Sequence, residues 1–309
     1  MAPGEPSRER CGNPMARYFM ATRPAFLSVT LLGALLGLAC ARQAGVPLDA
    51  AGAAVTLLFA LVAHAAANVI NDYHDAEGDA GNSERLFPFT GGSRFIQNGV
   101  LSRAATGRFG YALLLSVIPA GMWLVQRSAP GLLVIGLAGL LVGWAYSAPP
   151  LKLAARGLGE AAVAAGWGLV VAGSDFVQRG AFEPGPLLAG LGYGLMVANL
   201  LYINQFPDAV ADARAGKMTL VARLGRHRAV GGYALIALGA VFALLLGVAL
   251  GLLPPLALAA LLALLPGSAA YRRLLADAER PAKLRPAIFA TLAAVHLFGL
   301  LLAAACVFG

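Results

Sequence analysis

The sequence predicts an all-α membrane protein in which about nine transmembrane helices form a bundle around a central cavity. Of its 309 residues, 59% are hydrophobic and only 12% are charged, which is about half the charged fraction of a soluble globular domain. Apolar runs near the length that crosses a bilayer as a helix, about 20 residues, recur along the whole chain. The predicted spans are residues 24–41, 50–71, 107–125, 130–147, 158–176, 187–206, 229–250, 252–271 and 286–308.

Turn-forming residues separate several of these runs. Proline or a Gly/Pro pair stands near the start of a span at Pro130, at 184–186 and at 254–255, where a helix is expected to begin after a turn. The seventh and eighth runs can also be read as one bent helix over 229–271. Such a helix would far exceed the roughly 20 residues of a single crossing, so two spans are predicted.

Basic residues indicate how the spans are oriented. All but three of the 23 lysines and arginines fall on one side of the membrane when nine spans are threaded, the exceptions being Arg42, Arg127 and Arg179. Cytoplasmic loops are enriched in these residues, so the N-terminus is predicted to be cytoplasmic. Residues 1–23 are then a cytoplasmic arm rather than a signal peptide, and residues 24–309 a single transmembrane domain. The net charge of +8 reflects topology and anionic lipid headgroups, not nucleic-acid binding.

Three cysteines, Cys11, Cys40 and Cys306, stand far apart in the sequence. Their spacing matches neither a zinc-binding motif nor a framework of disulfides. They are interpreted as incidental small apolar residues, which is how unpaired cysteines commonly behave in proteins.

Acidic side chains gather at the ends of two predicted spans. The second span runs into Asp72, Asp75 and Asp79, and the sixth into Asp208 and Asp212. On a helix, the spacings i, i+3, i+7 and i, i+4 put each set on one face. Carboxylates on one face repel one another, and bare charges near hydrocarbon are costly. A bound cation is therefore predicted, and hard oxygen ligands that leave room for substrate phosphates favour Mg²⁺.

The two acidic segments repeat one pattern. Asn68 precedes Asp72 by four residues, and Asn204 precedes Asp208 by four; Asn71 adds a further amide beside the first cluster. Each pattern ends an even-numbered span, and the two spans are four apart in the chain, which predicts a pseudo-repeat of a four-helix unit. In such a bundle both acidic ends lie on one side and face each other, so metals between them can clamp one diphosphate.

Basic residues follow both acidic segments and also occur in the middle loop. They are Arg85, Arg94, Lys152, Arg156, Arg214, Lys217 and Arg223. Each alone is explained by topology or by lipid headgroups, whereas the set beside two acidic clusters predicts a diphosphate clamp. Pro149 and Pro150 cannot continue a helix, so their segment is predicted to be a loop that lines the site.

At these residues the chain resembles the UbiA superfamily of intramembrane prenyltransferases. The first acidic segment matches the Asn-Asp-x-x-Asp-x-x-x-Asp motif of that superfamily, and the second its Asp-x-x-x-Asp motif with a lysine following. The middle segment matches at Tyr146, Lys152, Arg156 and Glu160. Within the superfamily the chain is most similar to 1,4-dihydroxy-2-naphthoate polyprenyltransferases, at residues 91–99, 204–208 and 216–225.

The resemblance implies a Mg²⁺-dependent enzyme of a bacterial inner membrane, with its active site on the cytoplasmic side. It would transfer the prenyl group of a polyprenyl diphosphate to an aromatic acceptor, expected to be 1,4-dihydroxy-2-naphthoate in menaquinone biosynthesis. The residues expected to hold Mg²⁺ are Asp72, Asp75, Asp79, Asp208 and Asp212. Those expected to bind diphosphate are Asn68, Asn71, Arg85, Arg94, Asn204, Arg156 and Lys217. The catalytic set is Asp72, Asp75, Asp208, Asp212 and Lys152, while Tyr146 and Tyr202 would stabilise the allylic cation or bind the acceptor.

The sequence is also compatible with two other functions. The same reaction on 4-hydroxybenzoate is the alternative within the superfamily, and a secondary transporter is the alternative of another class. Internal repeats and charges at broken helices also occur in transporters, but transporter sites lie near the midplane, whereas these acids lie at one face. A phosphoalcohol transferase would carry one contiguous Asp/Gly-rich motif, which this sequence lacks. Membrane lipid is an expected partner, and no obligate protein partner is inferred.

Overall fold

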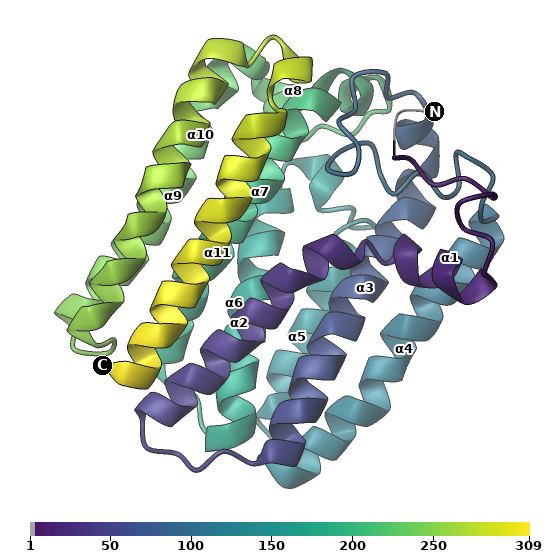
Figure 1. Cartoon of the computed structure of the whole chain (residues 1–309). Helices are drawn as coiled ribbons and strands as arrows, with labels where there is room; N and C mark the ends of the chain where they lie inside the picture. Colours follow the sequence, from purple (N-terminus) through teal and green to yellow (C-terminus); the bar gives the residue numbers. More distant parts are fainter. Residues whose placement is uncertain (1–3) are drawn as a thin grey trace.

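The computed structural model describes residues 4–309 as a bundle of helices, with no β-strand in that range (Figure 1). The first half contains α1 (Pro14–Ala21), α2 (Pro24–Gln43), α3 (Ala50–Ala80), α4 (Arg103–Arg127), α5 (Leu132–Ala145), η1 (Ala154–Arg156) and α6 (Gly159–Arg179). The second half contains α7 (Pro184–Arg214), α8 (Leu220–Leu224), α9 (Arg226–Ala249), η2 (Pro255–Ala263), α10 (Leu264–Asp277), η3 (Pro281–Lys283) and α11 (Arg285–Phe308).

The predicted all-α membrane bundle is confirmed, and each predicted span has a helix in the predicted order. Within the described residues, eight helical segments are long and apolar enough to cross a membrane. The fourth span corresponds to α5, an apolar helix of only 14 residues. The seventh and eighth spans are separate, because α9 ends at Ala249 and Gly251 takes a positive φ of 69° before η2 begins.

Helices α3 and α7 are longer than the membrane requires. Each has 31 residues and is therefore about 46 Å long at 1.5 Å per residue. The hydrocarbon core of a bilayer is only about 30 Å thick. The C-terminal turns of both helices, which carry the acidic segments, therefore extend beyond the hydrocarbon. They lie at the same end of the bundle, because Lys217 after α7 pairs with Asp75 of α3. We call this end the polar end.

Small residues allow the central helices to pack closely. A Cβ added to Gly194 in α7 would lie 2.3 Å from the carbonyl oxygen of Ala164 in α6, and one added to Gly37 in α2 would lie 2.2 Å from that of Val171. Such close backbone contact is typical of helix pairs in membranes. It makes α2, α6 and α7 a rigid support for the side chains that point into the bundle.

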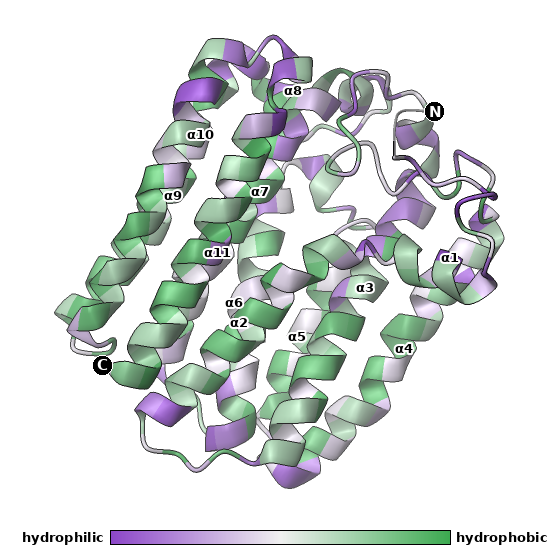
Figure 2. Cartoon of the chain, viewed as in Figure 1, coloured by the Kyte–Doolittle hydropathy of each residue, from purple (hydrophilic) through white to green (hydrophobic). Residues whose placement is uncertain are grey.

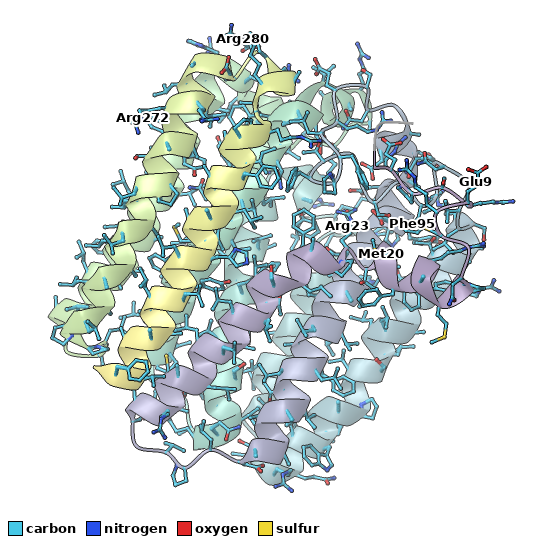
Figure 3. All side chains as sticks on the ribbon, in the orientation of Figure 1. Glu9, Met20, Arg23, Phe95, Arg272 and Arg280 are labelled. Carbon is cyan, nitrogen blue, oxygen red and sulfur yellow. The ribbon has the colours of Figure 1, made fainter. Side chains whose placement is uncertain are left out.

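The outer surface of the bundle is apolar, as a lipid-facing surface must be. Large side chains on the outer helices are largely exposed, with Leu235 at 72%, Phe242 at 67% and Leu137 at 66% of their full area. Figure 2 shows hydrophobic colouring along the helices, with hydrophilic residues gathered near the bundle ends. Arg272 and Arg280 lie in the upper half of the view in Figure 3, as does Arg23.

The segment before α2 packs on the loop between α3 and α4, residues 81–102, which we call the α3–α4 loop. Glu5 is buried and accepts hydrogen bonds from Arg85 Nε at 2.7 Å and Asn98 Nδ2 at 3.3 Å. Arg8 Nε donates to the carbonyl oxygen of Gly99 at 2.8 Å. The arm and the loop therefore form one polar layer over the end of the bundle.

Two of the cysteines that stand far apart in the sequence are neighbours in space. The sulfur atoms of Cys40 in α2 and Cys306 in α11 are 3.9 Å apart, and both residues are buried. The two cysteines are close because α11, the last helix of the chain, packs against α2. The spacing of cysteines along the sequence does not reveal such a contact.

Candidate active site

The two acidic segments meet at the polar end across one lysine. Lys217 follows α7, and its Nζ lies 2.8 Å from Oδ2 of Asp75 and 3.7 Å from Oδ1 of Asp212. Asn71 donates from Nδ2 to the same Asp75 oxygen at 2.9 Å and to Ser147 Oγ at 2.8 Å. One ammonium group therefore bridges the acids of α3 and α7, and the acidic helix ends face each other as predicted.

A cavity of about 550 Å³ extends from these charged groups into the bundle. Its polar wall includes Arg23, Asn68, Asn71, Asp79, Asn204, Asp208, Asp212 and Lys217. The rest of its wall comes mainly from apolar side chains of α3 to α7, such as Leu133, Leu137 and Leu140. The cavity therefore joins a charged end to an apolar end, which suits a molecule with an anionic head and a hydrocarbon tail.

Asp72 is buried directly behind the polar wall, next to Arg23. Its Oδ1 pairs with the guanidinium group of Arg23 and accepts a hydrogen bond from the backbone N–H of Ser93 at 3.1 Å. Its Oδ2 is buried without a hydrogen-bond partner among the described residues, and so is Oδ1 of Asn204. Buried oxygens of this kind are rare in proteins and call for a ligand.

The α3–α4 loop covers the acids of both helices. Asp208 accepts hydrogen bonds from Asn82 Nδ2 at 2.5 Å and from the backbone N–H of Gly91 at 3.3 Å. Gly92 is so close to α3 that an added Cβ would lie 2.2 Å from Oδ2 of Asp79. Backbone amides of this loop thus contact carboxylates of α3 and α7 alike and hold them at the cavity.

The two cations at the polar wall remain protonated. Burial alone would lower the pKa of Lys217, but the Asp75 and Asp212 carboxylates raise that pKa well above its usual value. The pKa of Arg23 is likewise raised, because attraction to Asp72 outweighs the cost of burial. Each cation is a fixed positive charge, already positioned to bind an anion at the cavity.

Other predicted phosphate-binding residues lie outside the cavity wall. Arg85 pairs with Glu5 and donates from Nη1 to the carbonyl oxygen of Asn82 at 2.8 Å. Arg94 donates from Nη1 to the carbonyl oxygen of Asp79 at 2.6 Å. Lys152 and Arg156 are exposed near the polar end. The structure therefore brings Asn68, Asn71, Asn204 and Lys217 to the cavity but not these four basic residues.

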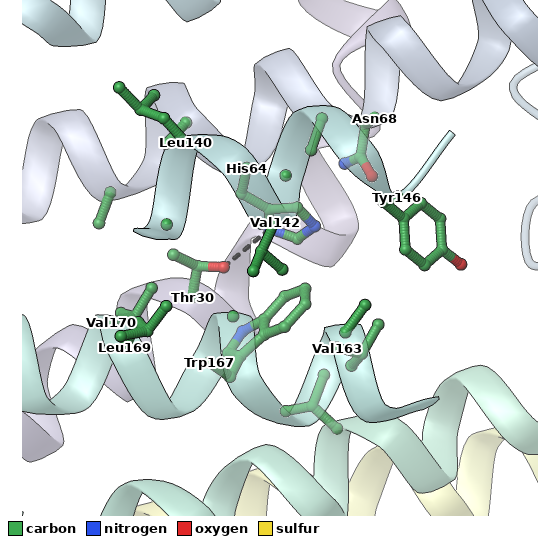
Figure 4. Close-up of a pocket in the computed structure, with 18 of the residues that line it drawn as sticks. Thr30, His64, Asn68, Leu140, Val142, Tyr146, Val163, Trp167, Leu169 and Val170 are labelled. Atoms are coloured by element: carbon green, nitrogen blue, oxygen red, sulfur yellow. Dashed lines mark hydrogen bonds between the residues drawn. The ribbon is translucent and has the colours of Figure 1, made fainter. Parts of the chain in front are cut away.

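The two predicted tyrosines differ in position. Tyr146 lines the cavity near Asn68, as Figure 4 shows. Tyr202 is buried between α7 and α9, where its hydroxyl donates to the carbonyl oxygen of Ala229 at 2.7 Å. Its ring does not line the cavity, since the close helix packing at Gly232 encloses it. Of the two, only Tyr146 is placed to contact a molecule bound there.

The sequence matches the model of the UbiA prenyltransferase family over residues 26–295. The chain belongs to this family. It is therefore a prenyltransferase and an integral membrane protein, and the resemblance drawn from its motifs is confirmed.

Curated relatives of this prenyltransferase include 1,4-dihydroxy-2-naphthoate octaprenyltransferases. That of Escherichia coli K12 is 28% identical over 235 residues, which cover 72% of this chain and 73% of the relative. That of Bacillus subtilis 168 is 26% identical over 230 residues, which cover 73% of this chain and 70% of the relative.

Solved structures share the fold of this prenyltransferase. A UbiA homolog from Aeropyrum pernix K1 superimposes with a TM-score of 0.70 at 17% identity, covering 89% of this chain and 97% of the other. A UbiA homolog from Archaeoglobus fulgidus bound to DMAPP and Mg²⁺ gives a TM-score of 0.58 at 15% identity, covering 93% and 99%. At these identities the likeness establishes the fold of the bundle.

Several groups at the cavity of this prenyltransferase were missed by sequence reasoning. Arg23 is the last residue before α2, and it takes a left-handed φ of 56° while its side chain reaches Asp72. Thr90 of the α3–α4 loop, and His64 and Trp167 deeper inside, also line the cavity. The position of Arg23 next to Pro24 in the sequence does not indicate that its side chain pairs with Asp72. His64, in contrast, is an ionisable residue within an apolar run, on the same face of α3 as Asn68. Such a residue inside a transmembrane helix indicates a functional site, so the sequence contains a signal for His64.

Proposed function

We propose that this prenyltransferase transfers the prenyl group of a Mg²⁺-bound polyprenyl diphosphate to 1,4-dihydroxy-2-naphthoate. The observation that carries the proposal is the bridge of Lys217 between Asp75 and Asp212 at the charged end of a largely apolar cavity. A diphosphate fits the charged end, and an isoprenoid chain fits the apolar end. The names of the Escherichia coli and Bacillus subtilis relatives support the choice of acceptor.

The residues at the polar end fit Mg²⁺. Among the described residues no three acidic, histidine or cysteine side chains converge closely enough to hold a metal by themselves. Mg²⁺ commonly shares its coordination between one or two carboxylates, water and substrate phosphates, so such a cage is not needed. The unpartnered Oδ2 of Asp72 would supply one hard ligand. The proposed Mg²⁺ ligands are Asp72, Asp75, Asp79, Asp208 and Asp212.

Bound Mg²⁺ would neutralise diphosphate oxygens and so make the diphosphate a better leaving group. In the proposed mechanism Lys217 and Arg23 bind the same oxygens and stabilise the charge that develops as the C–O bond breaks. Asn68 and Asn204 are proposed to orient the diphosphate by donating from their amide groups. Asn71, whose amide donates to Asp75 and Ser147, holds Asp75 in place and stays a prediction for diphosphate binding. Arg85, Arg94, Lys152 and Arg156 stay predictions for the same substrate, from the outer part of the site.

The allylic cation left by the diphosphate has to be protected from water until the acceptor attacks. The apolar wall contributed by α4, α5 and α6 excludes water from the region below the charges. Tyr146 lines the cavity near the polar wall, and its ring face can stabilise a positive charge. Tyr202 stays a prediction for this role, supported by the resemblance alone.

A competition assay tests the acceptor. With 1,4-dihydroxy-2-naphthoate and 4-hydroxybenzoate at equal concentration, we expect mass spectrometry to find mainly the prenylated naphthoate. Gly91 and Gly92 line the cavity, so the backbone there can approach a bound aromatic ring closely. A product mixture dominated by prenylated hydroxybenzoate would overturn the acceptor proposal and leave the prenyltransferase activity untouched.

We further propose that the polar end, with the arm of residues 1–23, faces the cytoplasm of a bacterial inner membrane. Residues 1–3 of that arm lie outside the described part of the chain. The excess of lysine and arginine at this end supports the orientation. The remainder, residues 24–309, is proposed to be one domain.

Thiol labelling tests this orientation. In a background without Cys11, cysteines placed at the exposed positions Ser83 and Ala213 are expected to react with an impermeant reagent in inside-out vesicles only. A cysteine at exposed Gln43, at the opposite end of α2 from the arm, is expected to react in intact spheroplasts and serves as the control. Labelling of Ser83→Cys from the outer face would reverse the proposed topology.

A further inference from the structure

One histidine lies inside the cavity, below the charged wall. His64 is on α3, four residues before Asn68 and eight before Asp72, so the three share one helix face. Its Nδ1 is 2.8 Å from Oγ1 of Thr30 in α2. Its ring meets that of Trp167 in α6 edge-on, with centroids 4.9 Å apart and planes at 82°. Three helices therefore fix the position and tilt of this imidazole.

The second ring nitrogen of His64 is free to act. Within residues 4–309, Nδ1 is the ring atom that has a hydrogen-bond partner, and Nε2 has none. In Figure 4 the ring lies between Thr30 on one side and Asn68 and Tyr146 on the other. Because Nδ1 is turned to Thr30, Nε2 is directed to the Tyr146 side. That side is the charged end of the cavity, where the C–O bond of a prenyl diphosphate would break.

A prenyl tail leaves this nitrogen unsatisfied. Hydrocarbon offers no hydrogen bond, and a polar atom enclosed without a partner is destabilising. Nε1 of Trp167 is also buried without a partner among the described residues. The unpartnered Nε1 of Trp167 and the cavity-facing Nε2 of His64 are two polar atoms that a polar molecule, other than the tail, would satisfy.

We propose that His64 binds a hydroxyl group of the aromatic acceptor and takes its proton during prenyl transfer. This inference rests on the proposed function and adds the residue that activates the acceptor. When Nδ1–H donates to Thr30, the neutral imidazole presents the lone pair of Nε2 to the cavity. Thr30 therefore acts as a positioning residue that selects the tautomer.

The C–O bond of the prenyl diphosphate breaks, and its electron pair leaves with the diphosphate. A ring carbon of the acceptor forms a C–C bond to the allylic carbon, while the acceptor O–H bond breaks and its electron pair becomes part of a C=O group. The proton moves to Nε2 of His64. The bond from that ring carbon to its original substituent, hydrogen or carboxylate, then breaks, and its electron pair makes the ring aromatic again. The substituent leaves as a proton to water or as carbon dioxide, and the proton on Nε2 returns to the acceptor oxygen.

Steady-state kinetics of the purified protein in lipid nanodiscs test the proposal. His64→Phe keeps an aromatic ring of similar size but removes the proton acceptor, so kcat/KM for the acceptor is expected to fall by about 100-fold or more. The KM for the prenyl diphosphate is expected to stay unchanged, because His64 lies below the charged wall. His64→Gln keeps a hydrogen-bond acceptor, so it is expected to preserve the KM for the acceptor while kcat falls.

Three further variants separate a chemical role of His64 from a structural one. His296→Phe is the matched control, because His296 lies on α11 outside the cavity wall and bonds to Ser28 Oγ at 2.9 Å; it is expected to leave the kinetics unchanged. Thr30→Val removes the hydrogen bond that holds Nδ1 and is expected to lower kcat by about 10-fold. Thr30→Ser restores the hydroxyl and is expected to restore the rate.

The outcomes separate this inference from the function on which it rests. If the wild type prenylates the naphthoate and His64→Phe matches it, the role of His64 is overturned and the proposed function stands. Equal losses for both substrates in His64→Phe would mean a structural role and would also overturn the inference. If the wild type prenylates no hydroxylated aromatic compound, the proposed function itself fails.

Discussion

Replacement of Asp72, Asp75, Asp208 or Asp212 by asparagine is expected to lower kcat/KM by about 100-fold or more, since each change removes a charge that stabilises the leaving diphosphate. Asparagine has nearly the size of aspartate, so the helices keep their packing. The measurement is prenyl transfer in detergent, with expression and size-exclusion behaviour recorded beside it. Glu77→Gln is the matched control, because Glu77 lies on α3 among the same acids but its side chain is exposed and pairs with Arg103.

Near-normal turnover in two or more of the four variants would refute the assignment of these acids to the metal. Asp79 is expected to be less sensitive than the others. Its carboxylate lines the cavity, yet the loop at Gly92 is packed against its Oδ2. Part of the role of Asp79 is therefore to support the loop, and Asp79→Asn keeps an oxygen for that contact.

Gly92→Ala is expected to remove most activity, although the change adds a single methyl group. The new Cβ would lie 2.2 Å from Oδ2 of Asp79, and Gly92 has a φ of 73° that side chains rarely adopt. The loop or α3 must therefore move, and the backbone N–H of Ser93 then loses its bond to Asp72. A displacement of about 1 Å at catalytic groups can cost roughly 100-fold in rate. Prenyl transfer by the purified variant measures the loss.

Gly99→Ala separates strain in the backbone from damage to the site. Gly99 belongs to the same loop and has a φ of 67°, but an added Cβ would meet no atom within 4 Å. Both variants thus carry the unfavourable φ, at a cost of about 1 kcal/mol in stability. Only Gly92→Ala should lose activity. Similar activity in the two variants would show that the contact between the loop and Asp79 has no part in the reaction.

The features predicted from sequence are those that depend on neighbours along the chain. Apolar runs gave the spans in the right order, and helical spacing put Asp72, Asp75 and Asp79 on one face. The repeat of Asn68 to Asp72 at Asn204 correctly indicated two helix ends that face each other. The apolar length and the helical spacing of residues were enough to predict these features, because both are properties of a single segment.

The features that sequence reasoning missed depend on contacts between distant segments. Arg23 reaches Asp72 because α2 packs beside α3, and Arg85 is turned to Glu5 by the arm. The basic residues of the middle loop were expected to line the site, yet Lys152 is exposed. A count of charges beside an acidic motif cannot tell which cations face inward, since that depends on how loops fold over the bundle.

The ion pairs at the polar end bear on how the chain enters a membrane in the first place. Helices α3 and α7 insert with carboxylates in their last turns, close to hydrocarbon, where an uncompensated charge is costly. Arg23 and Lys217 supply counter-ions from the chain itself, on Asp72, Asp75 and Asp212. The chain thus carries its own counter-ions for three of the acids that it must place at the membrane face.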